Sequence, residues 1–209
     1  MTEDEARDWL QESLGVPRET LGTLAQFVEF LRSESGLQNL VSRTTLANVW
    51  TRHIVDSAQL LTHAPGRGSW VDLGSGAGFP GLIVGTLRTE PVTLIELRRK
   101  RIDFLDRAVK LLGIESRVEV VGTRAETMPA KEHAVISARA FAPLDKLFAI
   151  GARFAGPNTI WVLPKGQSAQ AELDAVCRTW QGVFRIEPSV TEPASSILIA
   201  EQVRPREQR

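Results

Sequence analysis

Residues 72–81 carry the clearest chemical signal in the chain, because alternating glycines follow an acidic residue there. The segment reads Asp-Leu-Gly-Ser-Gly-Ala-Gly-Phe-Pro-Gly, between the apolar runs 70–71 and 82–84. Glycines such as Gly74, Gly76 and Gly78 let a backbone approach a ligand closely and tolerate positive φ, and Pro80 suits a first helical turn. The pattern predicts a strand, a ligand-holding turn and the start of a helix.

The carboxylate of Asp72 bears on which ligand this turn would hold. We expect it to place negative charge beside the pocket, which suits an adenosyl cofactor with an amino group and a sulfonium better than a pyrophosphate. The spacing of Gly76, Gly78 and Gly81 also fits the dinucleotide fingerprint, whose loop aims helix N–H groups at phosphates. The turn, with Phe79 in it, therefore favours S-adenosylmethionine, while a dinucleotide or a purely structural turn stays open.

Glu96 is the second acidic residue that we expect at the ligand. It lies near the end of an apolar run at 91–97 and is followed by Leu97. An acid at the end of this strand can accept hydrogen bonds from both ribose hydroxyls of an adenosine, which serves S-adenosylmethionine and NAD alike. The alternative is a solvated carboxylate paired with Arg98 or Arg99.

Two segments after the next strands could complete the nucleoside site. Backbone groups of Ala125 and Glu126 could read the adenine edge, with Arg124 beside them, although an ordinary Arg–Glu surface pair remains an alternative. Arg139 ends a later strand, where we expect it to face the transferable methyl group. A guanidinium cannot act as a base, but it can hold a phosphate or carboxylate bidentately. Phe141 could stack on a base or pack in the core.

Cations elsewhere could contact an anionic substrate. Lys165 follows another strand, and Arg52-His53-x-x-Asp56 lies on a predicted helix, where His53 and Asp56 could bond to each other. Both also have a purely structural alternative: Lys165 as an ordinary lysine in a turn, and His53 as a histidine whose hydrogen bonds are made within the fold. No residue is certain as a catalytic group; the candidates are Arg139, Lys165 and His53.

The sequence lacks the motifs that methyltransferases use for acceptors that must first be activated. It has no Asn-Pro-Pro-Tyr-like motif to bind an exocyclic amine, no Pro-Cys nucleophile and no metal-binding cluster of His or Cys. Guanine N7 already has a free lone pair, so its methylation needs alignment and exclusion of water rather than a general base. We therefore expect no metal and favour such an acceptor.

The elements that must position these residues alternate between strand and helix. Residues 1–65 are expected to form a helical cap and residues 66–209 a domain packed with it as one unit. Expected strands are 69–73, 91–97, 118–121, 134–137, 159–163 and a closing antiparallel pair, 183–188 and 196–203; expected helices are 79–87, 98–112, 144–154 and 169–179. This alternation predicts an α/β fold with a mostly parallel sheet covered by helices on both faces.

Composition excludes several classes of protein. The 209 residues, 43% of them hydrophobic, are enough for a packed core. A lone Cys177 excludes a disulfide framework, and the absence of both a long apolar run and a signal-peptide core predicts a cytoplasmic protein with no membrane contact. The formal net charge of zero argues against a protein that coats nucleic acid nonspecifically, though not against a local basic patch.

Together these motifs resemble the RsmG, or GidB, family of bacterial small-subunit ribosomal RNA guanine-N7 methyltransferases. The resemblance covers nearly the whole chain. Its carriers are Asn39-Leu40-Val41-Ser42, Arg52-His53-x-x-Asp56-Ser57, the glycine-rich segment 72–81, Lys100-Arg101-x-x-Phe104-Leu105, Arg124-Ala125-Glu126, Ser137-Ala138-Arg139-Ala140-Phe141 and Lys165-Gly166.

The resemblance implies a Rossmann-like class I methyltransferase fold with a seven-stranded sheet. The cofactor contacts that we expect, from the motifs and the resemblance together, are Asp72, Gly74, Gly76, Gly78, Phe79, Glu96, Leu97, Ala125, Glu126 and Arg139, with S-adenosylhomocysteine as product. The expected RNA contacts are Arg52, His53, Arg124, Arg139 and Lys165. The chain departs from many relatives at 194–196, where Ala-Ser-Ser replaces a basic residue, and this weakens a role in RNA binding for the C-terminal hairpin.

The expected substrate is a guanine in 16S ribosomal RNA, bare or within an assembling small subunit, and the expected state is a monomer. Besides a dinucleotide enzyme, two other functions stay open on the sequence alone. One is methyl transfer to a small metabolite or a protein, and the other is a non-catalytic S-adenosylmethionine-binding or ribosome-assembly role.

Overall fold

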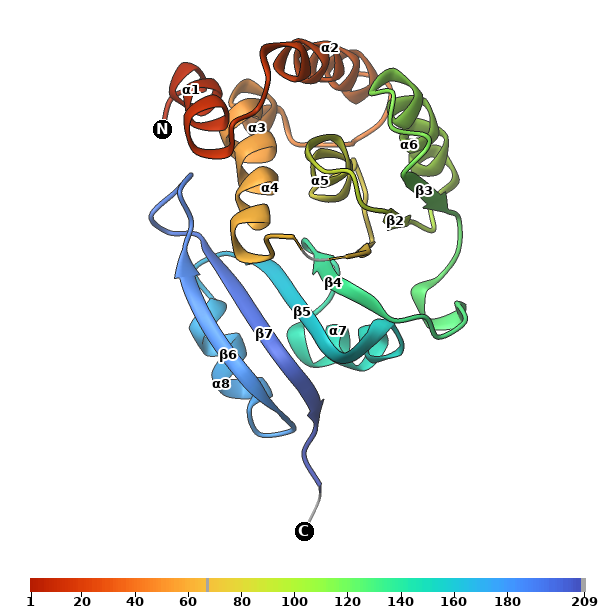
Figure 1. Ribbon diagram of the computed structural model, residues 1–209, viewed down its shortest axis with the longest axis vertical. Helices are drawn as coiled ribbons and strands as arrows, with labels where there is room; N and C mark the ends of the chain where they lie inside the picture. Colours follow the sequence, from red (N-terminus) through yellow and green to blue (C-terminus); the bar gives the residue numbers. More distant parts are fainter. Residues whose placement is uncertain (67, 208–209) are drawn as a thin grey trace.

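A seven-stranded sheet runs through the computed structural model, which describes residues 1–66 and 68–207 (Figure 1). The strand order is β3-β2-β1-β4-β5-β7-β6, and the first five strands are parallel, whereas β7 is antiparallel to both β5 and β6. The strands are β1 (Trp70–Leu73), β2 (Val92–Ile95), β3 (Val118–Val121), β4 (His133–Ala138), β5 (Ala155–Lys165), β6 (Trp180–Pro188) and β7 (Ser196–Pro205). The predicted mostly parallel sheet and its antiparallel closing pair are confirmed.

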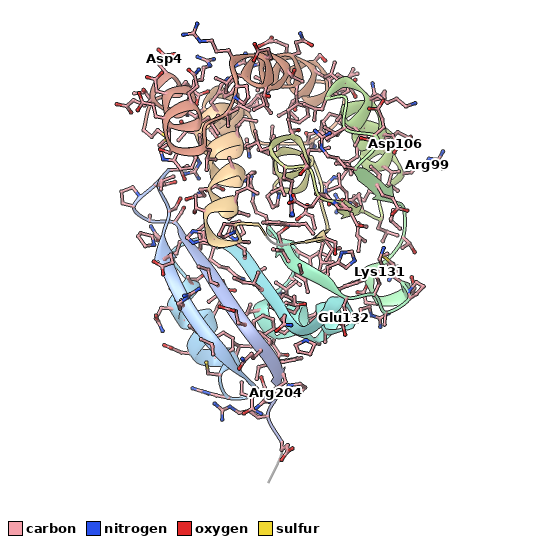
Figure 2. The ribbon with its side chains drawn as sticks, viewed as in Figure 1. Asp4, Arg99, Asp106, Lys131, Glu132 and Arg204 are labelled. Atoms are coloured by element: carbon pink, nitrogen blue, oxygen red, sulfur yellow. The ribbon has the colours of Figure 1, made fainter. Side chains whose placement is uncertain are left out.

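Helices cover both faces of this sheet: every residue of β1 and β2 is buried, and successive side chains point to opposite faces. Trp70 and Leu94 belong to one hydrophobic cluster, together with α5 (Gly81–Leu87) and α6 (Arg99–Leu111). Val71 belongs to a second cluster with α7 (Leu144–Gly151) and α8 (Ala169–Val176). Charged residues such as Arg99 and Asp106 extend away from these layers in Figure 2.

The N-terminal segment is helical, as predicted, and shares the first of these cores. Its elements are α1 (Glu3–Leu14), α2 (Arg18–Ser35), α3 (Arg43–Ala47), the π-helical turn η1 (Trp50–Val55), α4 (Asp56–Ala58) and the 3-10 turn η2 (Gln59–His63). The ring of Phe27 in α2 lies 6.0 Å from that of Phe79 and 6.4 Å from that of Phe104. The cap is therefore packed directly against the glycine-rich turn and α6.

Element boundaries differ from the prediction where pairing or turn geometry decides them. The strand expected at 159–163 is longer, because β5 pairs with β4 on one side and β7 on the other. The helix expected from 79 begins at Gly81, since Phe79 and Pro80 belong to the turn. None of the described helices is long and apolar enough to cross a bilayer.

Candidate functional site

The turn after β1 has the backbone that only glycine adopts easily. Gly74, Gly76 and Gly78 have φ values of 70°, 59° and 88°, in the region that L side chains rarely occupy. A Cβ atom added at Gly74 would overlap the ring of Phe141, and one at Gly78 would overlap Leu82. The glycines thus keep the turn close to its neighbours at the carboxyl edge of the sheet.

Asp72 holds this turn from inside the protein. It is fully buried; its Oδ1 accepts a hydrogen bond from Ser137 Oγ at 2.7 Å, and its Oδ2 accepts one from the Gly81 N–H at 3.2 Å. Ser137 Oγ also accepts from Trp70 Nε1 at 2.8 Å. Burial raises the pKa of Asp72 to about 6, against the opposing hydrogen bonds. We expected this carboxylate beside the ligand, whereas the structure places it beneath the turn, where it connects β1, β4 and α5.

Glu96 joins the end of β2 to the same turn. Its Oε2 accepts the Gly76 N–H at 2.9 Å, and its Oε1 accepts the N–H groups of Leu97 and Arg98, each at 2.8 Å. The cation near it is Arg101, whose Nη1 lies 3.8 Å from Oε2, rather than the side chains of Arg98 or Arg99. A carboxylate has about four acceptor sites, so Glu96 keeps capacity for ribose hydroxyls.

Apolar and backbone groups flank Glu96 along this edge. Leu97 is exposed to 54%, so its apolar side chain is available to a ligand beside the turn. The 3-10 turn η3 (Ala125–Thr127) follows β3, the neighbour of β2; Ala125 in it is buried, whereas Glu126 and Arg124 are exposed. The predicted nucleoside residues therefore share one edge of the sheet.

A cavity of about 610 Å³ opens at the carboxyl ends of β4 and β5, and its wall residue Phe141 lies against Gly74 of the turn. Of the predicted cofactor contacts, only Arg139 lines it. The size of the cavity is typical of small-ligand sites. The lining residues are Thr45, Arg52, His53, Asp56, Ala138, Arg139, Ala140, Phe141, Ala142, Pro143, Leu147, Pro164, Lys165, Gly166, Glu172, Ser195 and Ser196. The cavity unites four of the five predicted RNA contacts; Arg124 is not among its lining residues.

Arg139 connects the sheet to the cap within this cavity. Its Nη1 donates to Asp56 Oδ2 at 3.2 Å and to the Arg52 carbonyl oxygen at 3.3 Å, and its Nη2 lies 2.6 Å from His53 Nδ1. The guanidinium also lies 5.7 Å from the centre of the Phe79 ring. Arg139 thus stands between His53 and Asp56, which bond to it rather than to each other.

The same contacts determine the protonation state of His53 and which of its ring nitrogens carries the hydrogen. Burial and the nearby charge of Arg139 lower the pKa of His53 to about 3, so the ring is neutral. A guanidinium can only donate, so Nδ1 must accept and Nε2 carries the hydrogen. The ring stacks on Phe79 with 4.7 Å between centres. His53 is therefore a neutral donor placed between the cap and the glycine-rich turn.

Each cation of the cavity has an acidic partner. Lys165 Nζ donates to Glu172 Oε2 at 2.8 Å, Arg139 pairs with Asp56, and Arg52 pairs with Glu192. These carboxylates therefore offset much of the positive charge of the expected RNA contacts in the cavity.

The loop between β6 and β7 is bound to the cap by side-chain hydrogen bonds. Gln59 Oε1 accepts the Val190 N–H at 2.9 Å, Gln59 Nε2 donates to Ser189 Oγ at 3.0 Å, and Thr191 Oγ1 donates to Asp56 Oδ1 at 3.1 Å. Ser195 and Ser196 follow on the cavity wall. The hairpin segment without the basic residue thus borders the cavity with neutral side chains.

A family model for GidB, described as rRNA small subunit methyltransferase G, matches residues 20–192. The chain belongs to this family. A protein named "Ribosomal RNA small subunit methyltransferase G" from Rhizorhabdus wittichii is 50% identical, over 99% of this chain and 95% of its own length. One of the same name from Zymomonas mobilis is 44% identical, over 100% of this chain and 98% of its own.

Solved structures agree with the class I methyltransferase fold. The glycopeptide N-methyltransferase MtfA in complex with S-adenosylmethionine superposes with a TM-score of 0.59 at 11% identity, over 72% of this chain and 94% of that one. A ribosomal protein L11 methylase from Lactobacillus delbrueckii superposes with a TM-score of 0.58 at 12% identity, over 70% of this chain and 76% of that one. As a member of the GidB family with this fold, the protein is a methyltransferase.

Sequence reasoning missed the acidic half of the cavity. Glu172 and Glu192 were not singled out, and Asp56 was considered only with His53. Glu172 does lie in the first turn of α8, directly after β5, which places it near the end of that strand. For Glu192 the sequence holds no such signal, because its partner Arg52 belongs to the distant cap.

Proposed function

We propose that the protein transfers a methyl group from S-adenosylmethionine to N7 of a guanine in 16S ribosomal RNA, acting in the cytoplasm as a monomer. The observation that carries the proposal is the cavity at β4 and β5, which adjoins the glycine-rich turn and contains three cations. In open α/β sheets, ligands bind at the carboxyl ends where the strand order reverses, and here that point lies between β1 and β4. The family name of the relatives supports ribosomal RNA as the substrate.

The residues beside β1 and β2 fit S-adenosylmethionine. A Cβ atom at Gly76 would have no heavy atom closer than 3.6 Å, so the backbone there is open to a ligand, and Glu96 would accept hydrogen bonds from the ribose hydroxyls. Leu97 would cover the adenine, with the backbone of Ala125 and Glu126 at its edge. When bound, the cofactor supplies a methyl group on a positively charged sulfur, and S-adenosylhomocysteine is the product. Asp72 would act indirectly, by holding the turn.

The residues of the cavity suit an acceptor that needs no deprotonation. His53 is neutral with its accepting nitrogen occupied by Arg139, and neither Arg139 nor Lys165 can serve as a base while protonated. Their role would be to bind and orient the RNA and to exclude water. Methylation at N7 leaves a positive charge on the base, which Asp56 would stabilise across the cavity.

A transfer assay with methyl-labelled cofactor tests the proposal. We expect labelled 7-methylguanine in 16S RNA, and we expect intact small subunits to be labelled better than bare RNA, because a chain with no net charge has little general attraction for nucleic acid. Charge reversal by Lys165→Glu should abolish labelling, whereas Glu29→Gln, in an exposed ion pair on α2, should not. Equal labelling of an unrelated hairpin, or of a metabolite or protein instead of RNA, would contradict the proposal, as would cofactor binding without any transfer.

A further inference from the structure

Lys165 and Glu172 present a donor and an acceptor side by side on the cavity wall. Lys165 Nζ and Glu172 Oε2 are 2.8 Å apart, and Ser168 Oγ donates to Glu172 Oε1 at 2.7 Å. Burial acts to raise the pKa of Glu172, but the hydrogen bonds from Lys165 and Ser168 outweigh it and hold the pKa below its usual value, so the carboxylate is ionised. The wall therefore offers an ordered pair of opposite hydrogen-bonding groups rather than a bare cation.

This pair is complementary to one edge of guanine. Guanine places its O6 acceptor beside the N1–H donor, and the N2 amino group follows. An ammonium can donate to O6, while a carboxylate can accept from N1–H and N2–H together. Adenine in the same position would turn its amino group toward the ammonium and its unprotonated N1 toward the carboxylate. Both contacts would then be repulsive.

The order of the two groups in the fold matches the order of atoms on the base. The glycine-rich turn follows β1, and β4 separates β1 from β5 in the sheet. Lys165 ends β5, beside β4, whereas Glu172 comes from α8, which contacts β6 at the far edge of the sheet. On guanine, O6 is next to N7, and N1 and N2 lie farther away. A base with N7 toward the turn therefore meets Lys165 first and Glu172 second.

We propose that the Lys165–Glu172 pair selects guanine, with Lys165 donating to O6 and Glu172 accepting from N1–H and N2–H. This inference rests on the proposed function, since it needs N7 to be the methylated atom. It assigns Glu172 to recognition of the base rather than to phosphate binding or to the transfer itself.

Inosine tests the role of Glu172, because inosine keeps N7, O6 and N1–H and lacks only the N2 amino group. After the target guanine has been mapped, small subunits carrying guanine or inosine at that position would be compared as substrates by kcat/KM. The variants are Glu172→Ala, the isosteric Glu172→Gln and the control Glu29→Gln. Thermal unfolding and calorimetry with S-adenosylmethionine would show that each variant is folded and binds cofactor.

We expect the wild type to prefer guanine over inosine by roughly tenfold. Glu172→Ala should lose that preference and use guanine at least tenfold less well, Glu172→Gln should be intermediate, and Glu29→Gln should match the wild type. An unchanged preference in Glu172→Ala, or a wild type that uses both bases equally, would overturn the assignment while leaving the proposed function intact. A wild type that methylates neither substrate would overturn both.

Discussion

Replacing Gly74 by alanine tests whether the turn after β1 is the cofactor-binding element. Two costs follow from the structure. A non-glycine residue at φ 70° costs about 1–2 kcal/mol, and the new methyl group overlaps the Phe141 ring, which adds roughly 1–3 kcal/mol for forced repacking. We therefore expect Gly74→Ala to lower the free energy of unfolding by about 2–5 kcal/mol.

Gly113→Ala is the matched control for this variant. Gly113 has a φ of 65°, and a Cβ atom there would have no heavy atom within 4 Å. It should therefore carry the backbone cost of about 1–2 kcal/mol alone and bind S-adenosylmethionine like the wild type. Urea unfolding measures the stabilities, and titration calorimetry at a temperature where both variants are folded measures the affinities. We expect Gly74→Ala to lose at least tenfold in affinity; wild-type affinity in that variant would refute the placement of the cofactor at this turn.

Three further changes probe the acids of the site. Because burial raises the pKa of Asp72 to about 6 in the folded state, the unfolding free energy of the wild type minus that of Asp72→Asn should fall by about 2 kcal/mol as pH rises from 4 to 7. A pH-independent difference in urea unfolding would refute the burial argument. Glu192→Gln should free Arg52 for a phosphate, so RNA affinity should rise and the slope of log affinity against log salt concentration should steepen by about one unit. An unchanged slope would contradict a phosphate contact by Arg52. Glu96→Gln should weaken S-adenosylmethionine binding by about tenfold, whereas the exposed Glu119→Gln should not, and equal affinities by calorimetry would exclude a ribose contact.

Local pattern was enough to predict the layers of the fold and the position of the glycine-rich turn. Hydrophobic alternation, glycine spacing and helix periodicity are encoded within short windows, so β1, α5 and the end of β2 were predicted to within a few residues. The position of β7 between β5 and β6 depends on long-range pairing, which no short window contains.

The side-chain contacts of the site were less predictable for the same reason. Whether Asp72 faces a ligand or the interior depends on the register that brings Ser137 beside it across β1 and β4. Arg139 meets His53 and Asp56 only because the cap folds over the carboxyl edge of the sheet. Sequence could name these residues as important, but only the packed structure shows that the cations of the cavity are already paired.

The most direct test of the account is mass mapping of methylated bases in 16S ribosomal RNA from cells with and without the gene for this protein. We predict one 7-methylguanine that is present with the gene, absent without it, and restored by the wild-type chain but not by Gly74→Ala. Identical methylation of 16S RNA in both strains would contradict the claim that this cavity methylates a ribosomal guanine.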